Sequence, residues 1–148
     1  MKTKFAILIL LFALTLSCKT DNKKVEITNN EINEILEIEA SELKLNNGKK
    51  WSVNPETHEG VEKMDKIIKA FKKETNKNYN TLGKNLSKQT SYIIKSCNMV
   101  GEPHDQLHIV LVPMLEEISN IKDSSNSAEI ALKKLEDLIE EYFNYFKL

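Results

Sequence analysis

Four side chains that can bind a metal ion lie within one short stretch of the sequence, residues 97–108. They are a thiol, a thioether and two imidazoles, from Cys97, Met99, His104 and His108. The two histidines are spaced i, i+4 and so share one face of a helix, the spacing by which a helix grips a metal. Thiolate, thioether and imidazole together favour Cu(I), with Zn(II) as the competitor if the methionine is not used. The stretch therefore predicts a site for a soft or borderline metal ion.

Each of these residues also has an ordinary structural interpretation. A His-x-x-x-His pair is a weak signal by itself, and a single cysteine is more often a small buried apolar residue than a ligand. Glu102 and Asp105 are the expected second layer, because their carboxylates would hold the unliganded imidazole nitrogens. The positive end of a helix that begins near Pro103 disfavours a bound cation, although it keeps histidines neutral. A metal site and a purely structural cluster both remain open at this point.

The stretch forms the turn between two of four expected helices. Apolar residues recur at helical spacing in the ranges 54–73, 79–99, 103–121 and 128–146. Asn54-Pro55-Glu56 is a typical helix start and Gly101 a typical stop, whereas Pro113 is expected to kink or split the third helix. None of the four apolar stripes can be buried alone. The sequence therefore predicts an all-α fold, an antiparallel up-down-up-down four-helix bundle over residues 54–148.

A segment before the bundle, residues 31–53, is expected to hold a short helix and a hairpin. Residues 31–40 carry apolar side chains among glutamates, at a spacing that permits a short helix. In residues 43–53, apolar and polar side chains alternate on either side of Asn47-Gly48. That pair tolerates the positive φ angles of a type I′ turn, so a small β-hairpin is predicted. Trp51, the only tryptophan, is expected to pack on the domain.

Chain direction predicts which distant residues meet. Alternate helices of such a bundle point in opposite directions, so the starts of the first and third helices share one end with the ends of the second and fourth. That end is expected to collect every histidine of the chain together with the sulfur donors: His58, Cys97, Met99, His104, His108 and Tyr142 or Tyr145. Donors far apart in the sequence would thus reach a single end of the bundle.

The N-terminus indicates export. A short positive region, residues 1–4, precedes an apolar run over residues 5–16 that is too short for a membrane span and typical of a signal peptide, residues 1–17. The run ends in Leu14-Thr15-Leu16-Ser17-Cys18, which resembles the lipobox of bacterial lipoproteins. This resemblance implies lipidation of Cys18, a lipid-anchored tether over residues 18–30, and a place in the cell envelope, at the periplasmic face or the cell surface of the outer membrane. The mature domain is also similar to small exported lipoproteins associated with metal handling, a resemblance that defines no family and assigns no residue roles.

Lipidation of Cys18 would leave Cys97 without an intramolecular disulfide partner, since the chain has only two cysteines. An unpaired thiol in an oxidising compartment is a liability unless it is buried, liganded or reactive. The compartment therefore adds support to the predicted site.

Composition and motifs argue against several classes of function. The formal net charge is −1 and all 21 basic residues are lysines, so the forked guanidinium that recognises phosphate is missing and nucleic-acid binding is disfavoured. The sequence has no glycine-rich phosphate loop, no catalytic triad spacing and no second Glu-x-x-His-like motif for a di-metal carboxylate site. We therefore expect no enzyme activity.

The resulting expectation is a lipid-anchored envelope protein that binds or buffers copper, or next zinc, without turnover; a protein partner for metal transfer stays open. The first alternative is a metal-free interaction or structural module whose aromatic C-terminal helix is the contact surface. The second is a haem-binding bundle similar to b-type cytochromes, with Met64 and either His104 or His108 as axial ligands. Haem would colour the protein, and a Cu(I) or Zn(II) site would not.

Overall fold

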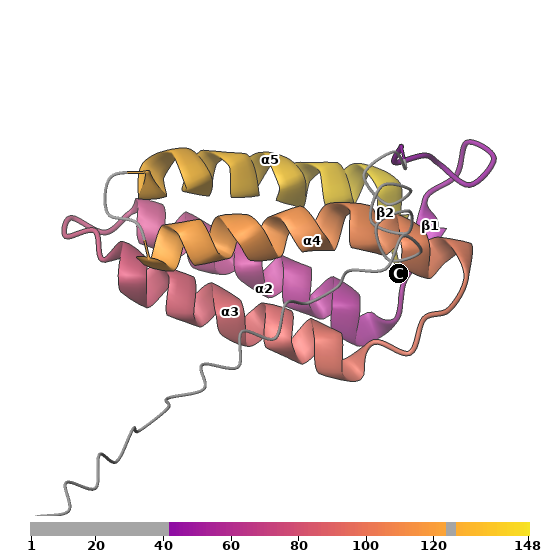
Figure 1. The fold of residues 1–148 in the computed structure, drawn as a ribbon, viewed down its shortest axis with the longest axis horizontal. Helices are drawn as coiled ribbons and strands as arrows, with labels where there is room; N and C mark the ends of the chain where they lie inside the picture. The colour runs from indigo at the N-terminus through magenta and orange to yellow at the C-terminus, as the bar shows by residue number, and fades with distance from the viewer. Residues whose placement is uncertain (1–41, 124–126) are drawn as a thin grey trace, which may run out of the picture.

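The computed structural model describes residues 42–123 and 127–148, and its described part is mostly helical. It contains four helices and two very short strands (Figure 1): β1 Trp51–Ser52, α2 Pro55–Lys72, α3 Tyr79–Ser96, α4 Glu102–Asp123, α5 Ala128–Tyr145 and β2 Phe146–Lys147. The predicted signal peptide, the tether with Cys18, and the short helix expected over residues 31–40 lie outside the described residues. No helix in the described part is long and apolar enough to cross a membrane.

The starts of α2 and α3 follow from local sequence, with one difference from expectation. Pro55 occupies the first turn of α2, where its missing N–H is not needed. The side chain of Asn54 does not cap that helix; its amide donates instead to the Ser96 backbone oxygen at the end of α3, at 3.2 Å. By contrast, Asn78 caps α3, because its side-chain oxygen accepts from the Thr81 backbone N–H at 2.9 Å.

The third predicted helix is one helix across its internal proline. α4 runs unbroken from Glu102 to Asp123 with Pro113 inside it, so the expected split is wrong. Buried side chains before and after the proline, Val110 and Met114 among them, keep both halves on the same core. Burial of a continuous apolar face therefore outweighs the hydrogen bond that the proline removes.

The segment before the helices contains the predicted turn, but its strand has a different partner. Asn47 and Gly48 have φ angles of 49° and 80°, and Asn46 and Lys49 exchange two backbone hydrogen bonds of 2.8 and 2.9 Å. Beyond this single bridge, β1 pairs in parallel with β2 at the C-terminus, with Trp51 opposite Phe146. Trp51 is buried as expected, and its indole N–H donates to the Lys44 backbone oxygen at 2.6 Å.

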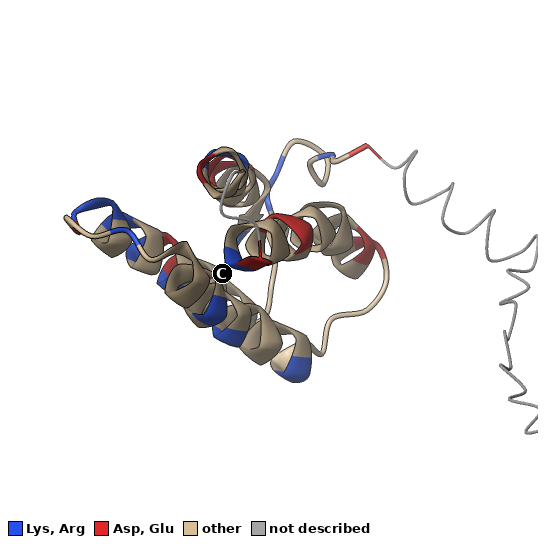
Figure 2. Ribbon diagram, turned by 60° about the vertical axis from the view of Figure 1, so that its left-hand side comes forward, with Lys and Arg blue, Asp and Glu red and all other residues tan. Residues whose placement is uncertain are grey.

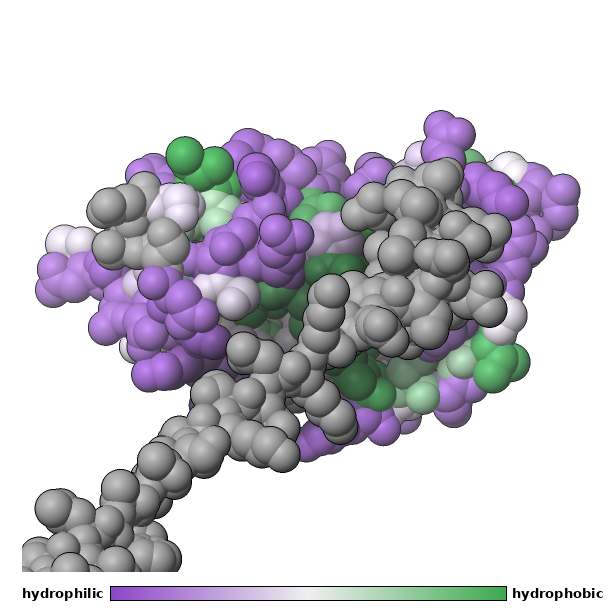
Figure 3. Space-filling view, in the orientation of Figure 1, coloured by the Kyte–Doolittle hydropathy of each residue, from purple (hydrophilic) through white to green (hydrophobic). Residues whose placement is uncertain are grey.

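Helices adjacent in sequence pack side by side, α2 on α3, α3 on α4 and α4 on α5 (Figure 1). Small residues allow the closest approaches: Gly60 lies against the Ile93 side chain and Gly83 against the Lys122 backbone. The largest fully buried side chains come from all four helices and include Met64, Leu86, Met114 and Tyr142. On the face that Figure 3 shows, hydrophobic residues are visible near the centre and hydrophilic ones surround them. Burial of the four stripes is thus the main source of stability.

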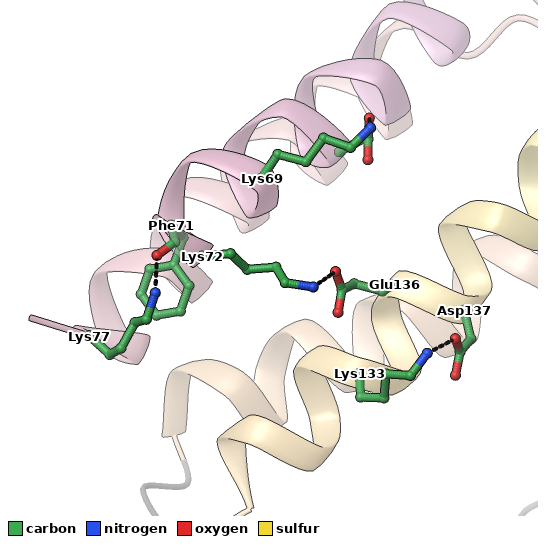
Figure 4. A network of polar contacts seen from close by, with 8 residues as sticks. Lys69, Phe71, Lys72, Lys77, Lys133, Glu136 and Asp137 are labelled. Carbon is green, nitrogen blue, oxygen red and sulfur yellow. Dashed lines mark hydrogen bonds and ion pairs between the residues drawn. The ribbon is translucent and has the colours of Figure 1, made fainter. Parts of the chain in front are cut away.

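Lysines at and just beyond the end of α2 make polar contacts at the end of the helices remote from the predicted metal site. Lys72 of α2 reaches Glu136 of α5 with a 2.7 Å ion pair (Figure 4). Lys77, just beyond α2, donates to the Phe71 backbone oxygen and lies 4.8 Å from the centre of that ring. Lys77 thus pairs with a backbone oxygen near the C-terminal end of α2 and packs on the Phe71 ring.

Candidate metal site

The thiol of Cys97 and the imidazole of His104 meet at the junction of α3 and α4. α3 ends at Ser96, three residues before the predicted end, because Cys97 is extended with φ −66° and ψ 122°. Gly101 has a φ of +69°, and its carbonyl accepts from the His104 backbone N–H at 2.8 Å, which turns the chain into α4. The Cys97 Sγ lies 3.7 Å from His104 Nδ1, and both side chains are partly exposed.

This separation matches the spacing of two donors on one ion. Zinc bonds of about 2.3 Å to sulfur and about 2.05 Å to nitrogen, at a tetrahedral angle, put the two donor atoms about 3.6 Å apart. The observed 3.7 Å between Cys97 Sγ and His104 Nδ1 needs almost no adjustment to meet that value. Without an ion, the same contact is a weak hydrogen bond between thiol and imidazole.

His108 lies beside this pair as the i, i+4 spacing predicts. Its ring centre is 4.3 Å from that of His104, with an angle of 52° between the rings. Partial burial and then the neighbouring His104 lower the pKa of His108, and the charge of Asp105 opposes that shift. A lowered pKa keeps the imidazole neutral near pH 7, and the neutral imidazole is the form that binds a metal. His108 is exposed, so its side chain has room to turn.

His58 is brought to the same end of the helices but into a different group. Its Nδ1 lies 3.2 Å from the Tyr142 hydroxyl, its Nε2 lies 3.8 Å from Glu62, and its ring also contacts Phe143. Burial raises the pKa of Tyr142, so that hydroxyl stays protonated. His58 therefore forms a polar contact between α2 and α5, and its contacts do not join it to Cys97 and His104.

The other predicted site residues, Met99, Glu102 and Asp105, make contacts that do not involve the Cys97–His104 pair. Met99 is partly buried and packs against the hydrophobic core. The Glu102 carboxylate forms a 3.1 Å ion pair with Lys44 and is thereby engaged away from the imidazoles. Asp105 is exposed and acts on His108 through its charge. Among residues 42–123 and 127–148, no group of three or more histidine, cysteine, aspartate or glutamate side chains lies close enough together to hold an ion. The arrangement described is a pair, Cys97 with His104, and a second imidazole, that of His108, next to it.

Gln106 is a positioning residue that the sequence analysis missed. It is only 5% exposed, and its Oε1 accepts from the Lys44 backbone N–H at 2.7 Å. The carbonyl of Lys44 in turn accepts from the Trp51 indole, so the first turn of α4 is tied to the segment before α2. The available signal was its place beside Leu107 on the buried face of the helix. This tie holds the turn that carries His104.

A surface hollow of about 700 Å³ lies elsewhere, between α4 and α5, and its lining includes Pro113, Leu138, Glu141 and Tyr145. The predicted metal donors are not part of its lining. Of the four aromatic residues at the C-terminal end, Tyr142 and Phe146 are buried and stack with 5.1 Å between ring centres, and Phe143 and Tyr145 are partly buried against the core. The aromatic end of α5 is therefore mainly core.

Searches against protein-family models, curated proteins and solved structures found no match for this chain.

Proposed function

We propose that this chain is a lipid-anchored protein of the cell envelope that binds or buffers a soft metal ion through Cys97 and His104, without turnover. The observation that carries the proposal is the 3.7 Å separation of Cys97 Sγ and His104 Nδ1, the spacing of two donors on one ion. Copper is the first candidate, since one thiolate and one or two imidazoles suit the soft Cu(I) ion, and zinc is the second. His108 is the nearest third donor, through a turn of its exposed side chain.

We infer an antiparallel up-down-up-down bundle as the frame that positions this pair. Contacts between helix ends support the inference. Asn54 at the start of α2 bonds to Ser96 at the end of α3, and His58 near the start of α2 contacts Tyr142 near the end of α5. At the opposite end, Asn80 of α3 donates to the Lys122 backbone oxygen of α4 at 3.0 Å.

The lipid anchor rests on the lipobox-like sequence that ends at Cys18. Intact-mass measurement of the chain produced in a bacterium tests it, because lipidation adds a diacylglyceryl thioether and removes the preceding residues. Cys18→Ala should abolish that mass shift. An unmodified wild-type chain would remove the anchor from the proposal and leave the metal pair to be judged separately.

Elemental analysis of the purified full chain tests the metal function. Wild type and His58→Ala should each retain about one equivalent of copper after exposure to Cu(I) and desalting, whereas Cys97→Ala and His104→Ala should lose it. His58→Ala is the matched control, since it removes an imidazole at the same end without touching the pair. Negligible copper and zinc in wild type, or equal amounts in all four proteins, would refute the metal function.

The alternatives predict different results. A metal-free interaction module would keep its function in Cys97→Ala and His104→Ala; Val100, 83% exposed in the turn between α3 and α4, is a candidate contact for it. A b-type haem site would need Met64 as a ligand. That side chain is fully buried within the hydrophobic core, so haem would have to displace existing packing. Visible absorption after haem titration tests it.

A further inference from the structure

The net charge of −1 conceals an uneven distribution of charge over the helices. α3 carries Lys84, Lys88 and Lys95 and no acidic residue. α4 has five acidic residues against one lysine, and α5 has five against two. In Figure 2, lysine colour alone marks α3, and acidic residues mark the neighbouring start of α4. One edge of the molecule is therefore positive although the whole chain is nearly neutral.

The lysines of α3 also differ from the others in their partners. Every lysine of α2, α4 and α5 forms an ion pair with a carboxylate: Lys63, Lys66, Lys69, Lys72, Lys122, Lys133 and Lys134. Lys84, Lys88 and Lys95 have no carboxylate partner among the described residues, and all three are exposed. Their charges are thus available to an external anion.

These lysines form a stripe on the outward face of one helix. The spacing of Lys84, Lys88 and Lys95 is i, i+4 and i+11, close to whole turns of an α-helix, and spans about 16 Å at 1.5 Å per residue. With Ser87, Ser91 and Tyr92 they line an open hollow of about 460 Å³. Tyr92 is held at its margin, where its hydroxyl donates to Glu59 at 3.0 Å, and Ile94 beside the stripe is 54% exposed.

We propose that this α3 lysine stripe, Lys84, Lys88 and Lys95, docks the domain on an anionic phospholipid surface. A straight row of point charges on a convex helix fits a plane of phosphates better than a single small anion, which would need convergent donors. The absence of arginine argues against nucleic acid. Exposed Ile94 supplies an apolar group that would lie at the level of the lipid headgroups.

The choice of a phospholipid surface as the partner rests on the proposed lipid anchor. Twenty-three residues, 19–41, separate Cys18 from the described domain. Even fully extended, they span at most about 85 Å, so a bilayer lies within reach of the domain at all times. Anchoring converts weak electrostatic contacts into an intramolecular encounter, and a few lysines then suffice.

Energy transfer from Trp51, the only tryptophan, to dansyl-labelled lipid measures how close the domain lies to the bilayer. The full chain is reconstituted in nanodiscs of phosphatidylcholine, with or without phosphatidylglycerol, after its lipidation is checked by intact mass. We expect higher transfer in the discs with phosphatidylglycerol, reversed by added salt. Limited amine acetylation, read by mass spectrometry, should slow about threefold or more at the three α3 lysines relative to Lys66 and Lys69.

The triple variant Lys84→Gln/Lys88→Gln/Lys95→Gln should lose the phosphatidylglycerol response. The matched variant Lys66→Gln/Lys69→Gln/Lys72→Gln removes the same charge from α2 and should keep the phosphatidylglycerol response; circular dichroism checks that both variants fold. Equal transfer in the two lipids, or equal loss in both variants, would overturn the proposal. Protection of the α3 lysines by soluble polyglutamate, with no effect of phosphatidylglycerol, would assign the stripe to an acidic protein and overturn it too. If intact mass shows no lipid on the chain, the proposed anchor is wrong. The α3 lysine stripe is then tested separately, by comparing binding of the chain to added vesicles with and without phosphatidylglycerol.

Discussion

Gly83→Ala tests how closely α3 and α4 approach at the end of the two helices opposite the Cys97–His104 pair. A Cβ at position 83 would lie 2.6 Å from the Cβ, 2.8 Å from the Cα and 2.9 Å from the backbone nitrogen of Lys122. The atoms it meets include backbone, so no rotamer change relieves the clash, and α3 has to move away from α4.

The expected loss follows from two opposing effects. Overpacking of this kind costs about 1–3 kcal/mol, and replacing glycine by alanine inside a helix returns up to about 1 kcal/mol. We therefore expect Gly83→Ala to lower the free energy of unfolding by about 1–2 kcal/mol, a drop in Tm of about 4–12 °C for a domain of this size.

Urea denaturation followed by helical circular dichroism measures this loss. Lys84→Ala, at the adjacent exposed position, is the control and should change stability by less than about 0.5 kcal/mol. Gly60→Ala should be less damaging than Gly83→Ala, because its Cβ would meet only the Ile93 side chain and one more distant backbone oxygen. A Gly83→Ala protein as stable as wild type would refute the close approach of α3 and α4 at Gly83 and Lys122.

Three further predictions concern individual side chains. In an NMR titration of the full chain, the pKa of His108 should lie below the ordinary histidine value of about 6.5, since partial burial and His104 lower it. As the pH drops through that ordinary value, the unfolded chain binds a proton at His108 before the folded chain does. The contribution of His108 to the free energy of unfolding therefore falls. An unshifted or raised pKa would contradict this. Tyr142→Phe should lower the free energy of unfolding by about 1 kcal/mol, because it removes the hydroxyl that His58 contacts at 3.2 Å; urea denaturation measures it, and a more stable variant would count against that contact. Gln106→Leu should lower the free energy of unfolding by about 1–3 kcal/mol, because it leaves the Lys44 N–H unpaired, and Gln106→Glu should lower it less, because it keeps an acceptor. Equal stability of wild type and both variants would show that the Gln106–Lys44 hydrogen bond is unimportant.

The sequence predicts the helices well because each carries a long apolar stripe with local start and stop signals. The Asn47-Gly48 turn was predicted for the same local reason. The pairing of Trp51 with Phe146 was not, since the residues lie far apart in the chain and two-residue strands leave no periodic pattern. Of the two outcomes predicted at Pro113, a kink or a split, the split was wrong, because the local cost of proline in the helix is smaller than the gain from burying both halves of α4.

The sequence predicted part of the candidate site, the meeting of Cys97 with His104, but not the separate position of His58. In the proposed antiparallel bundle, chain direction determines the end that a residue reaches, and it would bring His58, Cys97 and His104 to one end. It does not determine the rotation of each helix about its own axis. That rotation turns His58 toward Tyr142 and Phe143 of α5, away from the thiol. Cys97 and His104 meet because seven residues and one tight turn separate them, so their contact is nearly local.

X-ray absorption at the copper edge, on the full chain loaded with Cu(I), tests whether Cys97 and His104 bind the ion together. We expect copper with one cysteine sulfur and one or two imidazole nitrogens in wild type, and loss of the sulfur signal in Cys97→Ser. No retained copper in wild type, or the same sulfur signal in Cys97→Ser, would contradict it.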